Sequence, residues 1–406
     1  MRVSTGIIFD TGIAAIAQQQ QSLLQTQQQI ATGRRVTTPA DDPVASAQIL
    51  QVGQAQSLNQ QFATNQGTAK DLLAQTESTL GQVGSLLQDV RVIALNAGDP
   101  VLSNQDRASL ATELQGKLEE LLGLANSTDS NGSYMFSGYQ GNTQPFSRTA
   151  AGVVYNGDEG QRQIQVAASR QLAVSDNGAE VFQWVKNGNG VFVTGAATGN
   201  AGGGTIDGGQ VIAPASLTGH NYQIGFSVTG TTTTYTVTDT TTGNPVNAPA
   251  AGANPYTAGT AISFDGLQFT IQGAPANGDQ FTVAPSTNQS VFSTLQKLIT
   301  LLQSPVNGTA GQAGLTNGLS AALMNVDQAL DKTLTVRTAV GTRQREVDAL
   351  TSASSDADVQ YSARLSELQD TDYAKAISDL TKQQMSLDAA QQSYAKITGK
   401  SLFDYL

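Results

Sequence analysis

Few residues in this chain could carry out catalysis or bind a metal. The 406-residue sequence contains no cysteine and one histidine, His220. The lack of cysteine excludes disulfides, thiol nucleophiles and zinc or iron–sulfur sites that use thiolate ligands. A single histidine disfavours a His-rich metal site or a histidine-based catalytic triad. We expect His220 to be exposed in a loop, because glycine, asparagine and tyrosine surround it.

Three short patterns imitate functional motifs but lack required parts. The tetrapeptide at 398–401, TGKS, ends like a phosphate-binding loop, but it follows a predicted helix and lacks the glycine needed five positions earlier. Asp356 and Asp358 lack the glycine and glutamate of a calcium loop. The adjacent Asp41 and Asp42 suit a helix cap better than an acid–base pair. We therefore predict no catalytic, cofactor-binding or metal residues, no bound cofactor and no enzymatic activity.

The composition is polar and weakly charged. Lys and Arg number 21 against 32 Asp and Glu, which gives a net charge of −11 and argues against a partner that is nucleic acid. Charged residues make up 13% of the chain, against about 25% in an ordinary domain. Such surfaces suit close packing between subunits, because unpaired charges are costly to bury.

The sequence contains no membrane or targeting segment that we can identify. No run approaches 18 apolar residues, so we expect no membrane partner. The first 21 residues have no charged leader, continuous apolar run or cleavage site. The chain is therefore expected to be cytoplasmic, or to be exported by a route that reads no cleaved signal peptide.

The first 130 residues read as helix. Apolar residues interrupted by glutamine recur at spacings of four and three and form a seam, the stripe along which one helix packs on another. This seam predicts a helix before Gly33. Its members are Phe9, Ile13, Ile16, Gln20, Leu23, Gln27 and Ile30. Asp42 followed by Pro43 predicts the start of a long helix that ends near Gly98. Ser103 or Asn104 can cap another helix.

The middle and the end of the chain differ from each other. Residues 131–288 hold short alternating runs bounded by glycine, proline and threonine, which predict strands. The Gly-rich stretch 195–209 reads as a linker, so we place a boundary near residue 205. From residue 289 onward helical spacing returns, and Asp370 or Asp372 can start the last helix. The expected seam before it consists of Leu319, Leu323, Val326, Leu330, Leu334, Arg337 and Val340.

Two architectures fit these patterns. In the first, the fold is α+β: the N- and C-terminal segments form an antiparallel α-helical coiled-coil stalk, and β-rich outer domains are inserted in it. In the second, two unrelated helical domains flank a β domain. For the first architecture we expect a terminal coiled coil of residues 1–42 plus 368–406 and a helical bundle rod of residues 43–130 plus 289–367. We also expect a first β-rich domain at 131–204 and a second, inserted one at 205–288.

The turn TGRRVTTPADDP (32–43) contains two prolines, Pro39 and Pro43. It resembles the corresponding turn of the flagellin superfamily, and within it that of the hook-associated protein 3 (hook–filament junction) family, whereas flagellins usually have other residues in place of the two prolines. The segments GSYMFSGYQGNTQPF (132–146), VVYNGDEGQRQIQVA (153–167) and NGAEVF (177–182) resemble the hook-associated protein 3 family's first β domain. The stretch 368–397, which contains DTDYA, resembles the superfamily's C-terminal helix. Residues 205–288 exceed the usual chain and read as an extra β domain.

The resemblance implies a structural, self-assembling protein of the bacterial flagellum. It implies a ring of identical subunits, with the first hook-associated protein on one side and flagellin on the other. It also implies export in a largely unfolded form by the flagellar type III apparatus, with a chaperone on residues 365–406. The location would be extracellular, at the hook–filament junction.

Under this interpretation the terminal helices carry the assembly interface. Their seams contain glutamine, so we expect neighbouring subunits to complete them; the alternative is a pair closed within one chain. The residues at the turn would contact the next subunit or simply cap a solvated helix. The candidate interface residues are Phe9, Ile13, Ile16, Leu23, Ile30, Arg34, Arg35, Asp41, Asp42, Tyr373, Ile377, Leu380, Leu387, Tyr394 and Ile397.

Two other functions stay open at this point. A flagellin would share both helical ends and the export route. An adhesin or secreted enzyme could use 205–288 as a binding or catalytic module, although that stretch contains no acid pair or nucleophile–base set that we can identify.

Overall fold

The computed structural model describes residues 5–398, with side chains from Ile7 to Lys396 except Ile8. These residues divide into two compact units. The first contains the described residues up to Gln66 and those from Ala349 onward; the second is Gly67–Asp348. Within the described range, no helix combines the length and apolar character needed to cross a membrane.

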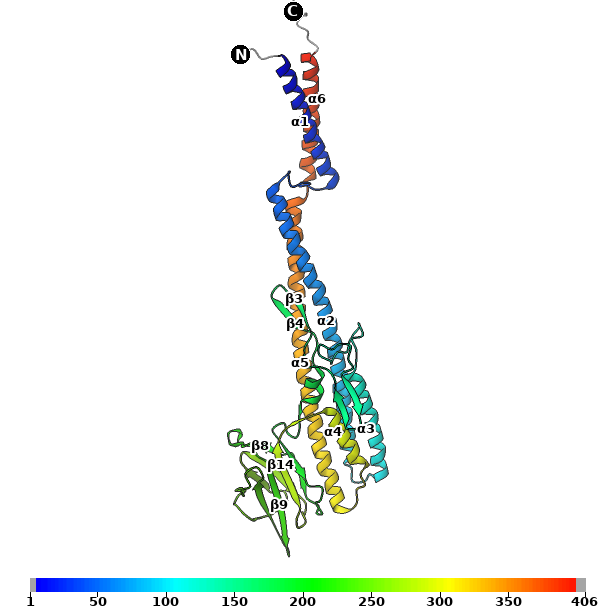
Figure 1. Ribbon diagram of the computed structural model, residues 1–406, viewed down its shortest axis with the longest axis vertical. Coiled ribbons are helices and arrows are strands. Elements are labelled where there is room, and N and C mark those ends of the chain that lie inside the picture. Colours follow the sequence, from blue (N-terminus) through cyan, green and yellow to red (C-terminus); the bar gives the residue numbers. More distant parts are fainter. Residues whose placement is uncertain (1–4, 399–406) are drawn as a thin grey trace, which may run out of the picture. The chain divides into compact units, whose positions relative to one another are not determined.

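The first unit is built from helices of both chain ends. Helix α1 (Thr5–Thr32) lies beside α6 (Tyr373–Thr398), and the beginning of α2 (Pro43–Ala97) lies beside the end of α5 (Gly308–Gln369) (Figure 1). Asp42 caps α2 by accepting a hydrogen bond from the Ala45 backbone, and Asp372 caps α6 by accepting one from Lys375. Both predicted helix starts are confirmed, as is the pairing of the two chain ends.

The second unit has a helical part built around α2 and α5. Helix α3 (Asn104–Ala125) packs on α4 (Val291–Gln303), and Ser103 closes the start of α3 in a capping box with Asp106. Apolar side chains from all four helices form a fully buried core. It includes Leu73, Leu80 and Leu87 of α2, Leu114 and Leu121 of α3, Leu295 and Leu298 of α4, and Val326 and Val340 of α5.

The buried face of α5 differs from the predicted one. Leu334 is exposed and Leu323 and Leu330 are half-buried, whereas Ala322 and Ala329 are buried. The buried positions still recur at spacings of four and three: Leu315, Leu319, Ala322, Val326, Ala329, Thr333, Val336 and Val340. Of the predicted seam, Leu319, Val326 and Val340 are therefore confirmed as buried, whereas the other three leucines lie beside the buried stripe.

The first β-rich region packs against the helices of the second unit. It contains two hairpins, β1 (Phe146–Thr149) with β2 (Gly152–Tyr155) and β3 (Gln163–Ala167) with β4 (Arg170–Ala173). A π-helical turn, Ala179–Gln183, and the short strand β5 (Val185–Lys186) follow, and β5 pairs with β15 (Asn288–Gln289). Phe146 and Phe182 stack on Phe292 of α4, with ring centroids 5.1 and 5.9 Å away.

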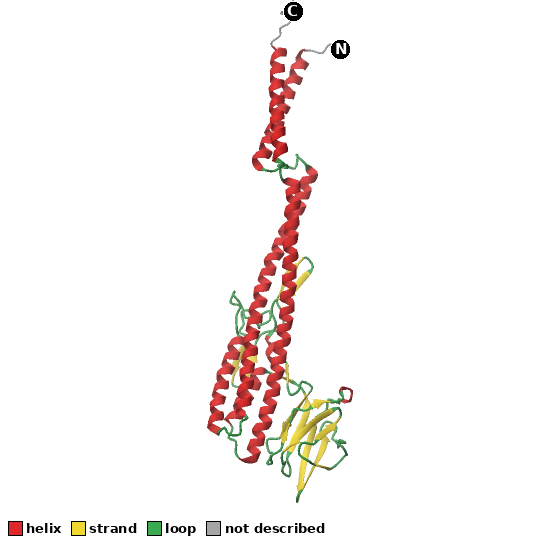
Figure 2. Cartoon of the chain, turned by 180° about the vertical axis from the view of Figure 1, so that it is seen from behind, coloured by secondary structure: helices red, strands yellow, loops and turns green. Residues whose placement is uncertain are grey.

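The second β-rich region is a pair of antiparallel sheets that share one apolar core (Figure 2). Five strands follow the order β11-β10-β9-β14-β6, and the other sheet has the order β12-β13-β7, with β8 also on β13. The strand bounds are β6 Phe192–Ala196, β7 Thr205–Ile206, β8 Gln210–Val211, β9 Tyr222–Thr229, β10 Thr232–Asp239, β11 Asn254–Pro255, β12 Ala261–Phe264, β13 Leu267–Gln272 and β14 Gln280–Pro285.

The Gly-rich stretch 195–209 is not a linker. Strand β6 pairs with β14, and its Phe192 belongs to the core of the second β-rich region. Asp279 accepts hydrogen bonds from the backbones of Ala201 and Gly202, which fastens the stretch to that region. The expected boundary near residue 205 therefore falls inside this region. Glycine is needed here for close backbone approach, as a Cβ at Gly202 would lie 2.3 Å from the Ala276 nitrogen.

His220 is half-buried rather than exposed. Its Nδ1 lies 2.8 Å from Oδ2 of Asp239, at the end of β10. Asp239 also accepts hydrogen bonds from the backbones of Thr241 and Thr242. The turn after β10 thus fixes the carboxylate that holds the histidine in place.

Candidate assembly surfaces

The turn between α1 and α2 is tied to the segment that precedes α6. The Arg35 backbone donates to the carbonyl of Gln369, and the Thr371 backbone donates to that of Gly33. The Arg35 guanidinium donates to the carbonyl of Leu368 and, at 3.2 Å, to Asp42. Arg34 forms a backbone bridge with Asp370. The sequence placed Arg34, Arg35, Asp41 and Asp42 together at this turn, and all four lie there.

Asp41 organises the inside of the same turn. Its carboxylate accepts hydrogen bonds from the Thr37 hydroxyl (2.7 Å), from the backbones of Thr37 and Thr38 and from Gln25 of α1. The Thr37 hydroxyl, followed by the Thr38 backbone, lowers the pKa of Asp41 to about 2. The pKa of Asp42 is also lowered, first by the Ala45 backbone and then by Arg35. The groups that bond to Asp41 and to Asp42 therefore favour the charged form of each carboxyl.

This turn should lose stability in acid, because its hydrogen bonds depend on the charged carboxylate of Asp41. Because the pKa of Asp41 is lower in the folded chain than its ordinary value of 3.8, its stabilisation is complete above that value and is lost as the pH falls towards about 2. NMR titration should show the amide signals of Thr37 and Thr38 moving with a midpoint near 2. The Asp41→Asn variant should show no such movement. A midpoint near 4 in the unmodified chain would contradict the arrangement.

The α1–α6 pair is thinly packed. Phe9 contacts Tyr394 edge-on, with 6.1 Å between ring centroids, and Gly12 gives that tyrosine room. Within this pair only Thr26 and Ala376 are buried among the described side chains. The predicted seam residues that face the partner helix are all half-buried: Phe9, Ile16, Leu23, Ile30, Leu380, Leu387 and Tyr394. A single chain therefore leaves this pair incompletely closed.

Three predicted interface residues face solvent instead of the partner helix. The exposed fractions are 55% for Ile13, 54% for Ile377 and 52% for Tyr373. On α1 the less exposed positions include Gly12, Ile16, Gln19, Leu23 and Thr26, so Ile13 lies beside the observed seam and not on it. The side chain of Ile397 lies outside the described residues.

Sequence reasoning missed a set of exposed apolar side chains in the first unit. On α2, Leu50 is 75% exposed, and the stretch 43–69 contains no Asp, Glu, Lys or Arg. That absence of charge was a signal that could have marked this surface. Among the described side chains of the first unit, this set contains, besides the three predicted residues above, Ile7, Leu24, Val44, Leu50, Leu58, Val359 and Met385.

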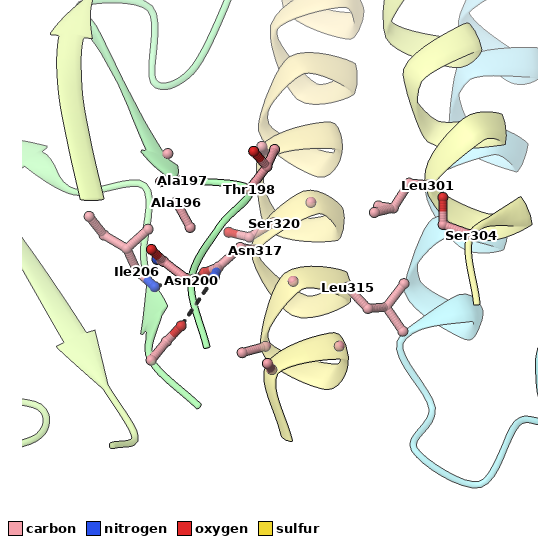
Figure 3. Close-up of a pocket in the computed structure, with 18 of the residues that line it drawn as sticks. Ala196, Ala197, Thr198, Asn200, Ile206, Leu301, Ser304, Leu315, Asn317 and Ser320 are labelled. Carbon is pink, nitrogen blue, oxygen red and sulfur yellow. Dashed lines mark hydrogen bonds between the residues drawn. The ribbon is translucent and has the colours of Figure 1, made fainter. Parts of the chain in front are cut away.

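A cavity of about 540 Å³ lies where the second β-rich region meets α4 and α5. Figure 3 shows Ile206 and Asn200 on the strand side, Asn317 and Ser320 on α5, and Leu301 on α4. The Asn317 amide accepts a hydrogen bond from the Ile206 backbone and donates one to the carbonyl of Gly204. The lining consists of neutral side chains without an acid or a base. This cavity is therefore a joint between elements and offers no acid–base chemistry.

Comparison with known proteins decides among the remaining functions. Residues 3–141 match the bacterial flagellin N-terminal helical region, and residues 196–285 match the D2-like domain of flagellar hook-associated protein 1. Flagellar hook-associated protein 3 of Salmonella typhimurium is 28% identical over 411 residues, with 99% of each chain covered. The crystal structure of hook-associated protein 3 from Legionella pneumophila is 34% identical, has a TM-score of 0.76 and covers 79% of this chain and 98% of its own. The chain belongs to the hook-associated protein 3 family.

Membership of the hook-associated protein 3 family makes the protein a structural component of the bacterial flagellum and not an enzyme. The family that the 32–43 turn and the first β-rich segments indicated is thereby confirmed. Flagellins match less of the chain: that of Listeria monocytogenes is 25% identical over 131 residues, 32% of this chain and 46% of its own. The extra β-rich region, unexplained by the sequence, resembles a domain type of another hook-associated protein.

Proposed function

We propose that the protein forms a ring at the junction between the hook and the flagellin filament, outside the cell. The observation that carries this proposal is the exposed apolar surface on the helices of the first unit. Large side chains such as Leu50 and Ile13 contact water in the single chain, and the stretches around them, 43–69 and 11–33, contain no charged residue. Burying each in an assembly would contribute about 1.5–3 kcal/mol. One Legionella pneumophila relative is itself described as a flagellar junction protein.

The parts of the chain would have different roles in this ring. Residues 1–42 and 368–406 would form the inner tube, and 43–130 with 289–367 would form a helical rod. The two β-rich regions, the first before β6 and the second from β6 (Phe192–Ala196) onward, would face outward. The half-buried and exposed interface residues described above would meet neighbouring copies, and the turn with Arg34, Arg35, Asp41 and Asp42 would meet the next subunit.

Family membership also supports a set of proposed partners. The first hook-associated protein would bind on the hook side and flagellin on the filament side. An export chaperone would hold residues 365–406 before the flagellar type III apparatus secretes the chain. The protein would need no cofactor, metal, nucleic acid or membrane for this task.

Deletion of the gene tests the proposal and its alternative together. We expect deletion to leave hooks intact while flagellin is secreted into the medium without forming filaments. Electron microscopy of the cells and analysis of the culture medium by electrophoresis would show this, and re-expression of the intact chain should restore filaments. Normal filaments after deletion would overturn the junction role. Loss of the filament protein itself from both cells and medium would indicate a flagellin instead.

A further inference from the structure

Eight asparagines in this chain precede a glycine: Asn131, Asn156, Asn177, Asn187, Asn189, Asn277, Asn307 and Asn317. In this dipeptide the backbone nitrogen of glycine can attack the side-chain amide carbon of asparagine, because glycine has no Cβ to hinder the approach. The reaction needs a glycine nitrogen and an asparagine amide that are not already held by hydrogen bonds. The eight sites differ in whether such hydrogen bonds are present.

Hydrogen bonds hold seven of the eight sites. At Asn189 the side chain accepts from two backbone nitrogens and donates to the carbonyls of Gly208 and Gly209. At Asn131 the following glycine nitrogen donates to the carbonyl of Asp129. Comparable bonds to the side-chain amide, to the glycine nitrogen or to both restrain the other five: Asn156, Asn177, Asn187, Asn277 and Asn317.

Asn307 and Gly308 differ because they lie where α5 begins. Both are exposed, and the carbonyl of Asn307 accepts from the Gly311 nitrogen as the first turn of the helix forms. The first four backbone nitrogens of a helix have no partner within it, so the Gly308 nitrogen is unbonded by its position. Among the described contacts, neither this nitrogen nor the Asn307 side chain has a hydrogen bond.

The helix itself favours the reactive form of the nitrogen. Attack requires the Gly308 nitrogen to lose its proton and carry a negative charge. The positive end of the helix dipole lies at the first turn and stabilises a negative charge there. The helix start at α5 thus exposes the amide and also supports the nucleophile, whereas Asn317 lies inside the same helix with its side chain bonded to Gly204 and Ile206.

We propose that Asn307 is the site of spontaneous deamidation in this protein. The deprotonated Gly308 nitrogen forms a bond to Cγ of Asn307, the bond from Cγ to Nδ2 breaks, and ammonia leaves with a proton from solvent. Water then opens the cyclic imide at either carbonyl, which gives aspartate or isoaspartate. The net change consumes one water, releases ammonia and adds one negative charge, with no oxidation or reduction. The isoaspartate product also adds one backbone carbon to the connection between α4 and α5.

Peptide mass spectrometry of the intact folded chain tests the site. The purified protein is held in mildly alkaline buffer and sampled over time, and trypsin then cuts after Lys297 and Lys332. The resulting peptide contains both Asn307 and Asn317, so fragment ions compare the two within one molecule. We expect Asn307 to convert about tenfold faster than Asn317, since breaking one or two hydrogen bonds before attack costs about that factor. Equal rates, or faster conversion of Asn317, would overturn the proposal.

A second arm separates the fold from the local sequence. In urea, where the helix start and the hydrogen bonds are lost, the rates at Asn307 and Asn317 should converge. If the difference in rate between Asn307 and Asn317 persists unchanged in urea, the fold does not cause it and the proposal is wrong. The Asn307→Gln variant should abolish conversion at this position while circular dichroism stays unchanged. Persistence of the mass change at that position would mean that the assignment is wrong.

Discussion

Replacement of Ile13 and Ile377 by serine in one chain should abolish swimming and filament attachment. Both side chains are more than half exposed on α1 and α6, so the isolated chain loses little when they are shortened. If each is buried between subunits, the loss is about 1.5–3 kcal/mol per side chain, and every subunit of the ring repeats it. Swimming in soft agar and electron microscopy measure the outcome in cells that carry only this variant.

A matched variant distinguishes assembly from a general effect of lost apolar surface. Ile212 in the second β-rich region is exposed to a similar degree, 50%, and lies far along the sequence from both chain ends. The Ile212→Ser chain should swim normally. Thermal melting of both purified variants should match that of the unmodified chain. Normal swimming of the Ile13→Ser, Ile377→Ser chain would show that these faces are not buried in the assembly.

The Arg343→Met variant should lose about 3–5 kcal/mol of stability in the first β-rich region. The Arg343 guanidinium donates to both oxygens of Asp176, at 2.8 and 2.7 Å, and to the carbonyl of Ala173, which fixes this region on α5. Burial raises the pKa of Asp176, and Arg343 opposes that shift. Removing the arginine therefore leaves a buried carboxylate without its cation, a change that costs about this much in other proteins. Urea unfolding followed by the fluorescence of Trp184 measures the loss.

An exposed ion pair between the same two parts of the chain supplies the control. Arg170 of β4 binds Glu346 of α5 with distances of 2.5 and 2.8 Å. Because this pair is largely exposed to water and salt, Arg170→Met should cost about 1 kcal/mol or less. Adding Asp176→Asn to Arg343→Met should restore part of the lost stability. Equal losses of stability for Arg343→Met and Arg170→Met would contradict the greater stabilisation that we assign to the buried ion pair.

Local signals in the sequence were sufficient for the helix ends and for the turn. Asp42 before Pro43, Ser103 and Asp372 each bond a backbone nitrogen at a helix start, as their residue types predict. Such caps depend on only a few neighbouring residues. The pairing of the chain ends is a long-range contact between α1 and α6, and helical patterning alone left it open against two separate helical domains.

The buried face of α5 could not be read so easily. Helical spacing admits two neighbouring faces when both carry apolar residues, and leucine was preferred over alanine. The structure buries Ala322 and Ala329 and leaves Leu334 exposed. Which face is buried depends on the elements packed against α5, and no local pattern reports their position. The same limitation applies to Ile13, whose outward position depends on where the seam of α1 begins.

The Gly-rich stretch shows a different limit. Composition marked 195–209 as a linker, yet its glycines allow the backbone to lie against other backbone atoms and Asp279 to bind it. Those contacts join residues about 80 positions apart, and no local pattern reports them. The exposed apolar surface of α2 is also invisible to periodicity, although its lack of charge could have indicated it.

The paired strands β6 and β14 have an evolutionary consequence. Because the path into the second β-rich region and the path out of it run side by side, an ancestor could have acquired or discarded that whole region at one point of its backbone. The helices would not have had to be rebuilt. Relatives of quite different lengths can thus share the same helices and differ in the β-rich region that they carry.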